Sequence, residues 1–195
     1  MYEYIKGLLV EINPTYAIVD NNGIGYKIEI SLQTYTSIQS KHNTSVQLFL
    51  HQIVREDAHL LFGFSDAKER ELFRMLISVS GIGANTARTM LSASSSAEIE
   101  ENIRNANVAS LKNIKGIGQK TAERLIVELR DKMGKNTSND EIFTPTHNRI
   151  KEEALSALFM LGYSKNMAEK VIDKIIRINP NISTEDLIKQ ALKQL

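Results

Sequence analysis

The sequence predicts a mixed α+β protein with several domains: an N-terminal five-stranded β-barrel of OB type at residues 1–64, a helical domain at 65–134, a flexible linker at 135–149 and a three-helix domain at 150–195. Three observations lead to this division. The spacing of apolar residues changes from two to 3.6 at Ser65, as it does where strands give way to helices. A Gly-Ile-Gly motif then occurs twice in the helical part, and a polar, turn-rich stretch precedes three further amphipathic segments.

The N-terminal part contains five short runs rich in β-branched and aromatic residues. They occupy residues 4–12, 16–20, 26–31, 46–54 and 58–64. Asn21-Asn22-Gly23 lies between two of them, and Asn and Gly tolerate the positive φ angles that tight hairpins need. Five strands would leave exposed edges in an open sheet, so we predict that the sheet closes into a barrel.

The helical part is expected to begin with a helix at residues 66–80, capped by Ser65 or Asp66. Further short helices are predicted at residues 86–91, 97–105, 108–113 and 121–133. Ser95 and Glu98 have the spacing of a capping box before the second of these.

Beyond the linker, three amphipathic helices are predicted at residues 150–161, 165–178 and 184–195, with Ser164 and Ser183 as caps. The core candidates of this small domain are apolar residues at helical spacing: Leu155, Leu158, Phe159, Leu161, Val171, Ile175, Ile188 and Leu192. Three short helices cannot bury every apolar side chain, so we expect some to remain exposed as a groove for a partner.

Composition and charge exclude several classes of protein. The 24 Lys and Arg residues nearly balance 23 Asp and Glu residues, so any surface for nucleic acid must be local, and residues 65–134 have the largest positive balance, +2. The absence of cysteine excludes disulfides and thiolate zinc sites. No apolar run is long enough to span a membrane and no signal peptide is recognisable, so we expect a cytoplasmic protein. Neither a P-loop motif nor histidines at metal-ligand spacing occur, and no cofactor or metal is expected.

The most informative pattern is an internal repeat. Gly81-Ile82-Gly83-Ala84-Asn85-Thr86-Ala87 recurs 35 residues later as Gly116-Ile117-Gly118-Gln119-Lys120-Thr121-Ala122. A single copy could be a Schellman-type helix cap. Two copies instead favour paired tight turns between helices, in which the apolar residue points inward and the missing Cβ atoms let backbone N–H groups approach a phosphate at a helix N-terminus.

The duplicated motif resembles the paired helix-hairpin-helix elements of DNA-binding proteins. Two stretches of sequence are the most specific: Val54-Arg55-Glu56-Asp57-Ala58-His59-Leu60-Leu61-Phe62-Gly63-Phe64, and the second hairpin continued to Leu129. Together with the order of the four parts, they resemble the RuvA family of Holliday-junction-binding subunits over the whole chain. The resemblance implies phosphate contacts from both hairpins, with Lys120 adding charge in the second. Family members often carry lysine where the first hairpin has Asn85, so that hairpin is expected to use backbone amides, helped by Arg88.

The resemblance also implies an assembly and partners. Four copies would form a plate, alone or as an octamer, that holds a four-way DNA junction open, with Glu56 and Asp57 as an acidic pin that repels phosphates at its centre. The last domain would be UBA-like and bind the RuvB ATPase, which drives branch migration in recombination and repair. Leu158, Leu161, Gly162 and Tyr163 are the candidate contacts. The RuvC resolvase is a further implied partner, and the chain itself would not be an enzyme.

Two other classes of function stay open. A helix-hairpin-helix glycosylase or nuclease would need a catalytic Asp or Lys in a pocket beside the hairpins, or a carboxylate cluster, and the adjacent pair Glu56-Asp57 diverges too much to chelate a metal alone. A barrel that binds single-stranded nucleic acid would need exposed aromatic and basic residues, whereas residues 1–64 carry a net charge of −2.

Overall fold

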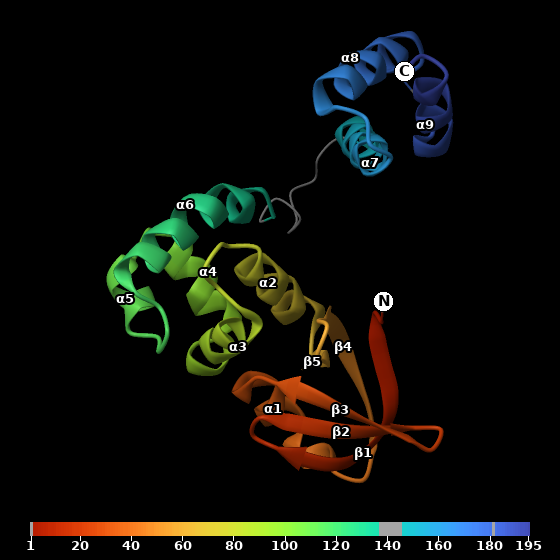
Figure 1. Ribbon diagram of the computed structural model, residues 1–195. Helices are drawn as coiled ribbons and strands as arrows, with labels where there is room; N and C mark the ends of the chain where they lie inside the picture. The colour runs from red at the N-terminus through yellow and green to blue at the C-terminus, as the bar shows by residue number, and fades with distance from the viewer. Residues whose placement is uncertain (1, 137–145, 181) are drawn as a thin grey trace. The chain divides into compact units, whose positions relative to one another are not determined.

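The computed structural model describes residues 2–136, 146–180 and 182–195 (Figure 1). The chain divides into two compact units, Met1–Thr137 and Ser138–Leu195. The first unit holds the strands and helices α1–α6, and the second holds α7–α9.

The first unit opens with a closed five-stranded barrel, as the sequence predicts. Its strands are β1 (Tyr4–Asn13), β2 (Tyr16–Asn21), β3 (Ile24–Ile30), β4 (Ser45–Val54) and β5 (His59–Phe64). They follow the order β1-β2-β3-β5-β4, and all neighbours are antiparallel except β3 and β5. The β2–β3 turn has Asn22 at φ 52° and Gly23 at φ 87°, which is why Asn and Gly occur there.

A short helix, α1 (Leu32–Ile38), and a 3₁₀ turn (Gln39–Lys41) connect β3 to β4, and the sequence pattern does not predict this helix. Ser31 caps it by accepting a hydrogen bond from the Thr34 N–H. The Glu69 carboxylate accepts hydrogen bonds from the Ser31 and Thr34 hydroxyls, the latter at 2.6 Å, and all three side chains are buried. A tertiary contact from α2 therefore stabilises α1.

Five helices complete the first unit: α2 (Ala67–Ile77), α3 (Ala84–Ala93), α4 (Ser96–Arg104), α5 (Val108–Lys112) and α6 (Gln119–Asn136). Asp66 caps α2, and Ser95 with Glu98 forms the predicted capping box of α4. These helices share a core with the barrel, because the Phe62 and Phe64 rings of β5 lie 5.1 and 4.9 Å from the ring of Phe73 in α2.

The second unit consists of α7 (Thr146–Met160), α8 (Lys165–Ile178) and α9 (Thr184–Leu192), and Ser164 and Ser183 cap the last two as predicted. Its buried core is Ala154, Leu158, Ala168, Ile172, Ile175, Ile182, Leu187 and Ala191. The prediction of Phe159, Leu161 and Leu192 as core residues is wrong, since they are 66%, 59% and 39% exposed. Ala154, Ala168 and Ala191 instead belong to the core, and the three larger side chains lie outside it.

The predicted linker at 135–149 is shorter than expected at both ends, and its central residues, 137–145, lie outside the described residues. Helix α6 continues through Gly134 to Asn136, and α7 already begins at Thr146. A glycine in a helix costs only about 1 kcal/mol relative to alanine, and polar residues do not by themselves end a helix. Within the described part of the chain, no helix combines the length and apolar character needed to cross a bilayer.

Candidate nucleic-acid interface

The two Gly-Ile-Gly motifs form turns with the same backbone hydrogen bonds. In the first, the Ile82 N–H donates to the Val79 carbonyl at 3.0 Å, and Gly81 has φ 92°. In the second, the Ile117 N–H donates to the Ile114 carbonyl at 3.0 Å, and Gly116 has φ 93°. A bond from i+3 to i with positive φ only at i+2 defines a type II β-turn, so these motifs are paired turns between helices and not Schellman caps.

Each turn has one residue packed into the core and one residue exposed to solvent. Ile82 and Ile117 are buried at 4% and 5% exposure, so each fixes its turn to the core as expected. The glycine that follows, Gly83 or Gly118, is exposed, and a Cβ atom built on either one would meet nothing within 4 Å. The backbone at these two positions is therefore open to a ligand.

Helix α3 begins without a side-chain cap. Its N-cap residue is Gly83, which has no side chain to accept a hydrogen bond. Other described helices begin at a side chain that accepts a backbone N–H bond: Ser31, Asp66, Ser95, Asn107, Ser164 and Ser183. The Ala87 N–H bonds to the Gly83 carbonyl at 2.9 Å, and Ala122 bonds to Gly118 in the same way at 2.9 Å. The N–H groups ahead of Ala87 point out of the helix end, where they and the helix dipole attract an anion.

The two hairpins differ in charge. Lys112, Lys115 and Lys120 surround the second turn, and all three are exposed. The residues 35 positions earlier, at the first turn, are the uncharged Ile77, Ser80 and Asn85. Thr121 lies in the first turn of α6 beside Lys120, and the Gln119 amide donates a hydrogen bond to the Glu123 carboxylate. The second hairpin can thus add side-chain charge to its backbone donors, whereas the first has no charged side chain at the matching positions.

The Arg88 side chain, which the sequence predicts as a helper of the first hairpin, is engaged with the barrel in this structure. Its Nη1 forms an ion pair with Glu29 of β3 and donates to the Thr15 carbonyl at 3.0 Å, so it joins α3 to the barrel. Arg124, which the sequence analysis did not select, donates from α6 to the Ser80 carbonyl at 3.3 Å. This bond connects the helix of the second hairpin to the turn of the first, and no local sequence pattern could have indicated it.

Glu56 and Asp57 lie at the tip of the β4–β5 hairpin. The Arg55 N–H donates to the Ala58 carbonyl at 2.8 Å and closes the turn, and both acidic side chains are exposed. The tip therefore presents two solvated carboxylates next to each other. No cluster of three or more His, Asp or Glu residues suited to a metal ion occurs among the described residues.

The candidate partner contacts in the second unit do not all reach the surface. Leu158 is fully buried, so its part is in the core and it cannot touch a partner in this structure. Gly162, at φ 95°, ends α7 in a Schellman motif, in which the Tyr163 N–H donates to the Leu158 carbonyl at 3.1 Å. Leu161 is exposed, as are its neighbours Phe159 and Met160.

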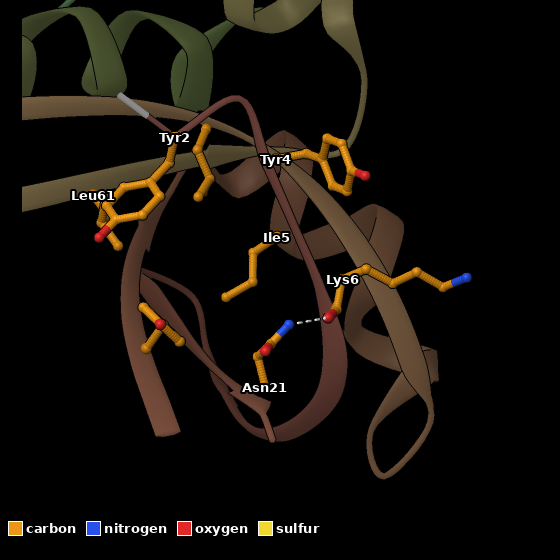
Figure 2. Close-up of a pocket in the computed structure, with 8 residues that line it drawn as sticks. Tyr2, Tyr4, Ile5, Lys6, Asn21 and Leu61 are labelled. Carbon is orange, nitrogen blue, oxygen red and sulfur yellow. Dashed lines mark hydrogen bonds between the residues drawn. The ribbon is translucent and has the colours of Figure 1, made fainter. Parts of the chain in front are cut away.

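The barrel has a pocket of about 460 Å³ with an aromatic rim, shown in Figure 2. Ile5 points into it, and the Asn21 side chain donates to the Lys6 carbonyl at 2.8 Å (Figure 2). Tyr2 and Tyr4 are about half exposed, as a single-strand site would require, but the Tyr4 and Lys6 side chains point away from the pocket. The rim of this pocket thus does not aim Tyr4 and Lys6 at one ligand, which disfavours single-strand binding in it. Elsewhere on the barrel, Lys27 Nζ lies 4.8 Å from the centre of the Tyr16 ring.

The barrel and the paired turns define the class of protein: a tandem helix-hairpin-helix protein with an OB-type barrel. Comparison with family models agrees, because residues 73–131 match the SAM-like helix-hairpin-helix tandem. Residues 1–63 match the RuvA N terminal domain, and residues 150–195 match the RuvA C-terminal domain. The chain belongs to the RuvA family.

Full-length relatives support the same assignment. The chain is 48% identical to a protein of Christiangramia forsetii, 46% to one of Flavobacterium psychrophilum and 45% to one of Bacteroides thetaiotaomicron, with all of each chain covered. Each of these relatives is named Holliday junction branch migration complex subunit RuvA.

Proposed function

We propose that this chain binds four-way DNA junctions as the RuvA subunit of a branch migration complex. It would act as a binding subunit, with ATP hydrolysis carried out by a RuvB ATPase that it recruits. The observation that carries the proposal is the exact repetition of an open, glycine-lined turn at the start of two helices, in a chain that belongs to the RuvA family.

Each hairpin would hold the DNA backbone without reading a base. Phosphate oxygens accept hydrogen bonds from helix N-terminal N–H groups, and such contacts position a duplex but carry no sequence information. The contact residues would be Gly81, Ile82, Gly83 and Asn85 in the first turn and Gly116, Ile117, Gly118, Gln119, Lys120 and Thr121 in the second. Arg124 would keep the two turns in a constant relative position.

The acidic tip would select the shape of the DNA. In a homotetramer with the four tips around its axis, Glu56 and Asp57 would repel phosphates at the point where strands cross. The hairpins would meanwhile attract the arms, so an open junction would be favoured over a continuous duplex. Residues 1–64 and 65–134 would thus act as one rigid DNA-binding part, in a tetramer or in an octamer of two such plates. We extend the same proposal to the RuvC resolvase, as a protein that acts on the open junction.

The second unit would recruit the ATPase through its exposed apolar residues. Phe159, Met160 and Leu161 follow one another at the end of α7, and the turn at Gly162 and Tyr163 completes this surface. Exposed neighbouring apolar side chains of this kind are typical of a site for a partner. We propose that residues 150–195 carry the whole contact with RuvB.

The double variant Gly83→Ala/Gly118→Ala tests the hairpin contacts. Neither Cβ would meet a protein atom, so the fold should be retained while the methyl groups obstruct a phosphate. A lost hydrogen bond to a charged group costs about 1.5–3 kcal/mol, so affinity for a four-way junction in a gel shift should fall at least about tenfold. Gly25→Ala is the matched control, since its Cβ meets only Ile18 Cγ2 at an ordinary 3.5 Å. Unchanged junction affinity in the folded double variant would contradict the proposal.

A further inference from the structure

The outer face of α8 carries three cations in a row. Lys170, Lys174 and Arg177 are spaced by four and three residues and are all exposed. In an α-helix this spacing places them within about 60° of one another and over about 10 Å along the axis. We refer to these three residues as the α8 basic row.

One cation from α7 partly offsets the charge of the two carboxylates beside this row. Lys151 of α7 places its Nζ atom 2.6 Å from Asp173 and 3.4 Å from Glu169. The hydrogen bond to Asp173 raises the pKa of Lys151, which keeps it charged at neutral pH. Among the described residues, Lys170, Lys174 and Arg177 themselves take part in no ion pair. Their charge is therefore free to act on a ligand.

The surface at the row is hollowed. Its three residues line a pocket of about 430 Å³ together with Asp173 and Ile178, and Ile178 is 77% exposed. A protein interface needs an apolar centre, and this pocket offers a single apolar side chain. The chemistry of the row thus fits a regular polyanion better than a protein surface.

We propose that the α8 basic row binds the phosphate backbone of DNA. One strand of a duplex carries a phosphate about every 3.4 Å along the axis, so a row of about 10 Å is long enough to reach three successive phosphates. The second unit then contributes a DNA contact of its own, separate from the hairpins and from the apolar surface at Phe159, Met160 and Leu161. The inference rests on the proposed function only in taking a junction arm as the DNA.

The test is the salt dependence of junction binding by the full chain. The variant Lys170→Gln/Lys174→Gln/Arg177→Gln is compared with Lys165→Gln/Lys189→Gln/Lys193→Gln, which removes the same charge outside the row. Loss of three phosphate contacts should flatten the slope of log affinity against log salt by about 2.7 per engaged chain. Between 50 and 200 mM salt the wild type should then lose about 40-fold more affinity than the row variant. The control should keep the wild-type slope.

Two results would overturn the inference. The row variant and the wild type could show the same slope, or the control could flatten the slope as much as the row variant does. An unchanged slope together with a lower affinity for the RuvB ATPase would assign the row to a protein partner. If the wild type bound no four-way junction, the proposed function would fail, and the same two variants measured on linear duplex would still test the row. Circular dichroism checks that each variant is folded.

Discussion

The first glycine of each turn, Gly81 or Gly116, should be needed for stability, whereas the second, Gly83 or Gly118, should not. Gly81 and Gly116 have φ near 92°, where an L-residue costs about 1–2 kcal/mol. A Cβ at Gly81 meets no atom within 4 Å, and at Gly116 it meets Thr86 Cγ2 at an ordinary 3.6 Å, so the backbone conformation sets the whole cost. Gly81→Ala and Gly116→Ala should each lower the free energy of unfolding by about 1–2 kcal/mol and Tm by about 2–8 °C.

Gly83→Ala and Gly118→Ala are the comparison, because their φ is not positive and their surroundings are open. They should change stability by less than about 1 kcal/mol, because a less flexible unfolded chain offsets the lower preference of alanine for the start of a helix. Thermal and urea unfolding of the four variants, with Gly81→Asn as a variant that tolerates positive φ, measures the difference. Equal destabilisation at Gly81 and Gly83, or none at Gly81 and Gly116, would refute the assignment of the strained position within each turn.

Three other predictions concern charge. Lys120→Ala should weaken binding to all DNA sequences alike and reduce the slope of log affinity against log salt by about 0.9. Asn85→Lys should increase this slope by a similar amount. A change in base preference would contradict a phosphate contact. Replacing Glu56 and Asp57 with Gln and Asn should tighten duplex binding more than junction binding in competition gel shifts, whereas magnesium-dependent cleavage lost in that variant would point to a nuclease. Burial raises the pKa of Glu69 above 4.5, so the folded state binds more protons and the free energy of unfolding should fall as pH rises from about 4.5 through the raised pKa. Unfolding curves of Glu69→Gln should lack that decline, and a decline that persists would assign it to another group.

Much of the fold follows from local pattern. The alternation of β1–β5 and the helical spacing after Ser65 predict the strands and most of the helices, because each element buries one face at its own period. The paired turns also follow from the sequence, because the motif is repeated with glycine at the same positions. Gly81 and Gly116 both have a positive φ, a conformation that glycine adopts readily. The type II geometry adds which of the two glycines in each motif is conformationally required.

The errors lie where distant residues decide the outcome. Arg88 finds Glu29, which is 59 residues earlier, and Glu69 stabilises α1 through Ser31 and Thr34. Neither contact could be predicted from the residues next to it in the sequence. The core of the second unit differs from the prediction for a related reason, because helical spacing alone does not decide which apolar residues face the other helices: Ala154, Ala168 and Ala191 are buried, and Phe159 is outside.

The claim that both hairpins hold junction phosphates through backbone amides can be tested directly by replacing single phosphates of a four-way junction with uncharged methylphosphonates. Binding of each modified junction is measured for the wild type and for Gly83→Ala/Gly118→Ala. We predict that the wild type loses affinity at a few discrete phosphates on each arm and that the double variant, already weakened, is insensitive at those same positions. An identical pattern of sensitivity in the wild type and the variant would contradict the account.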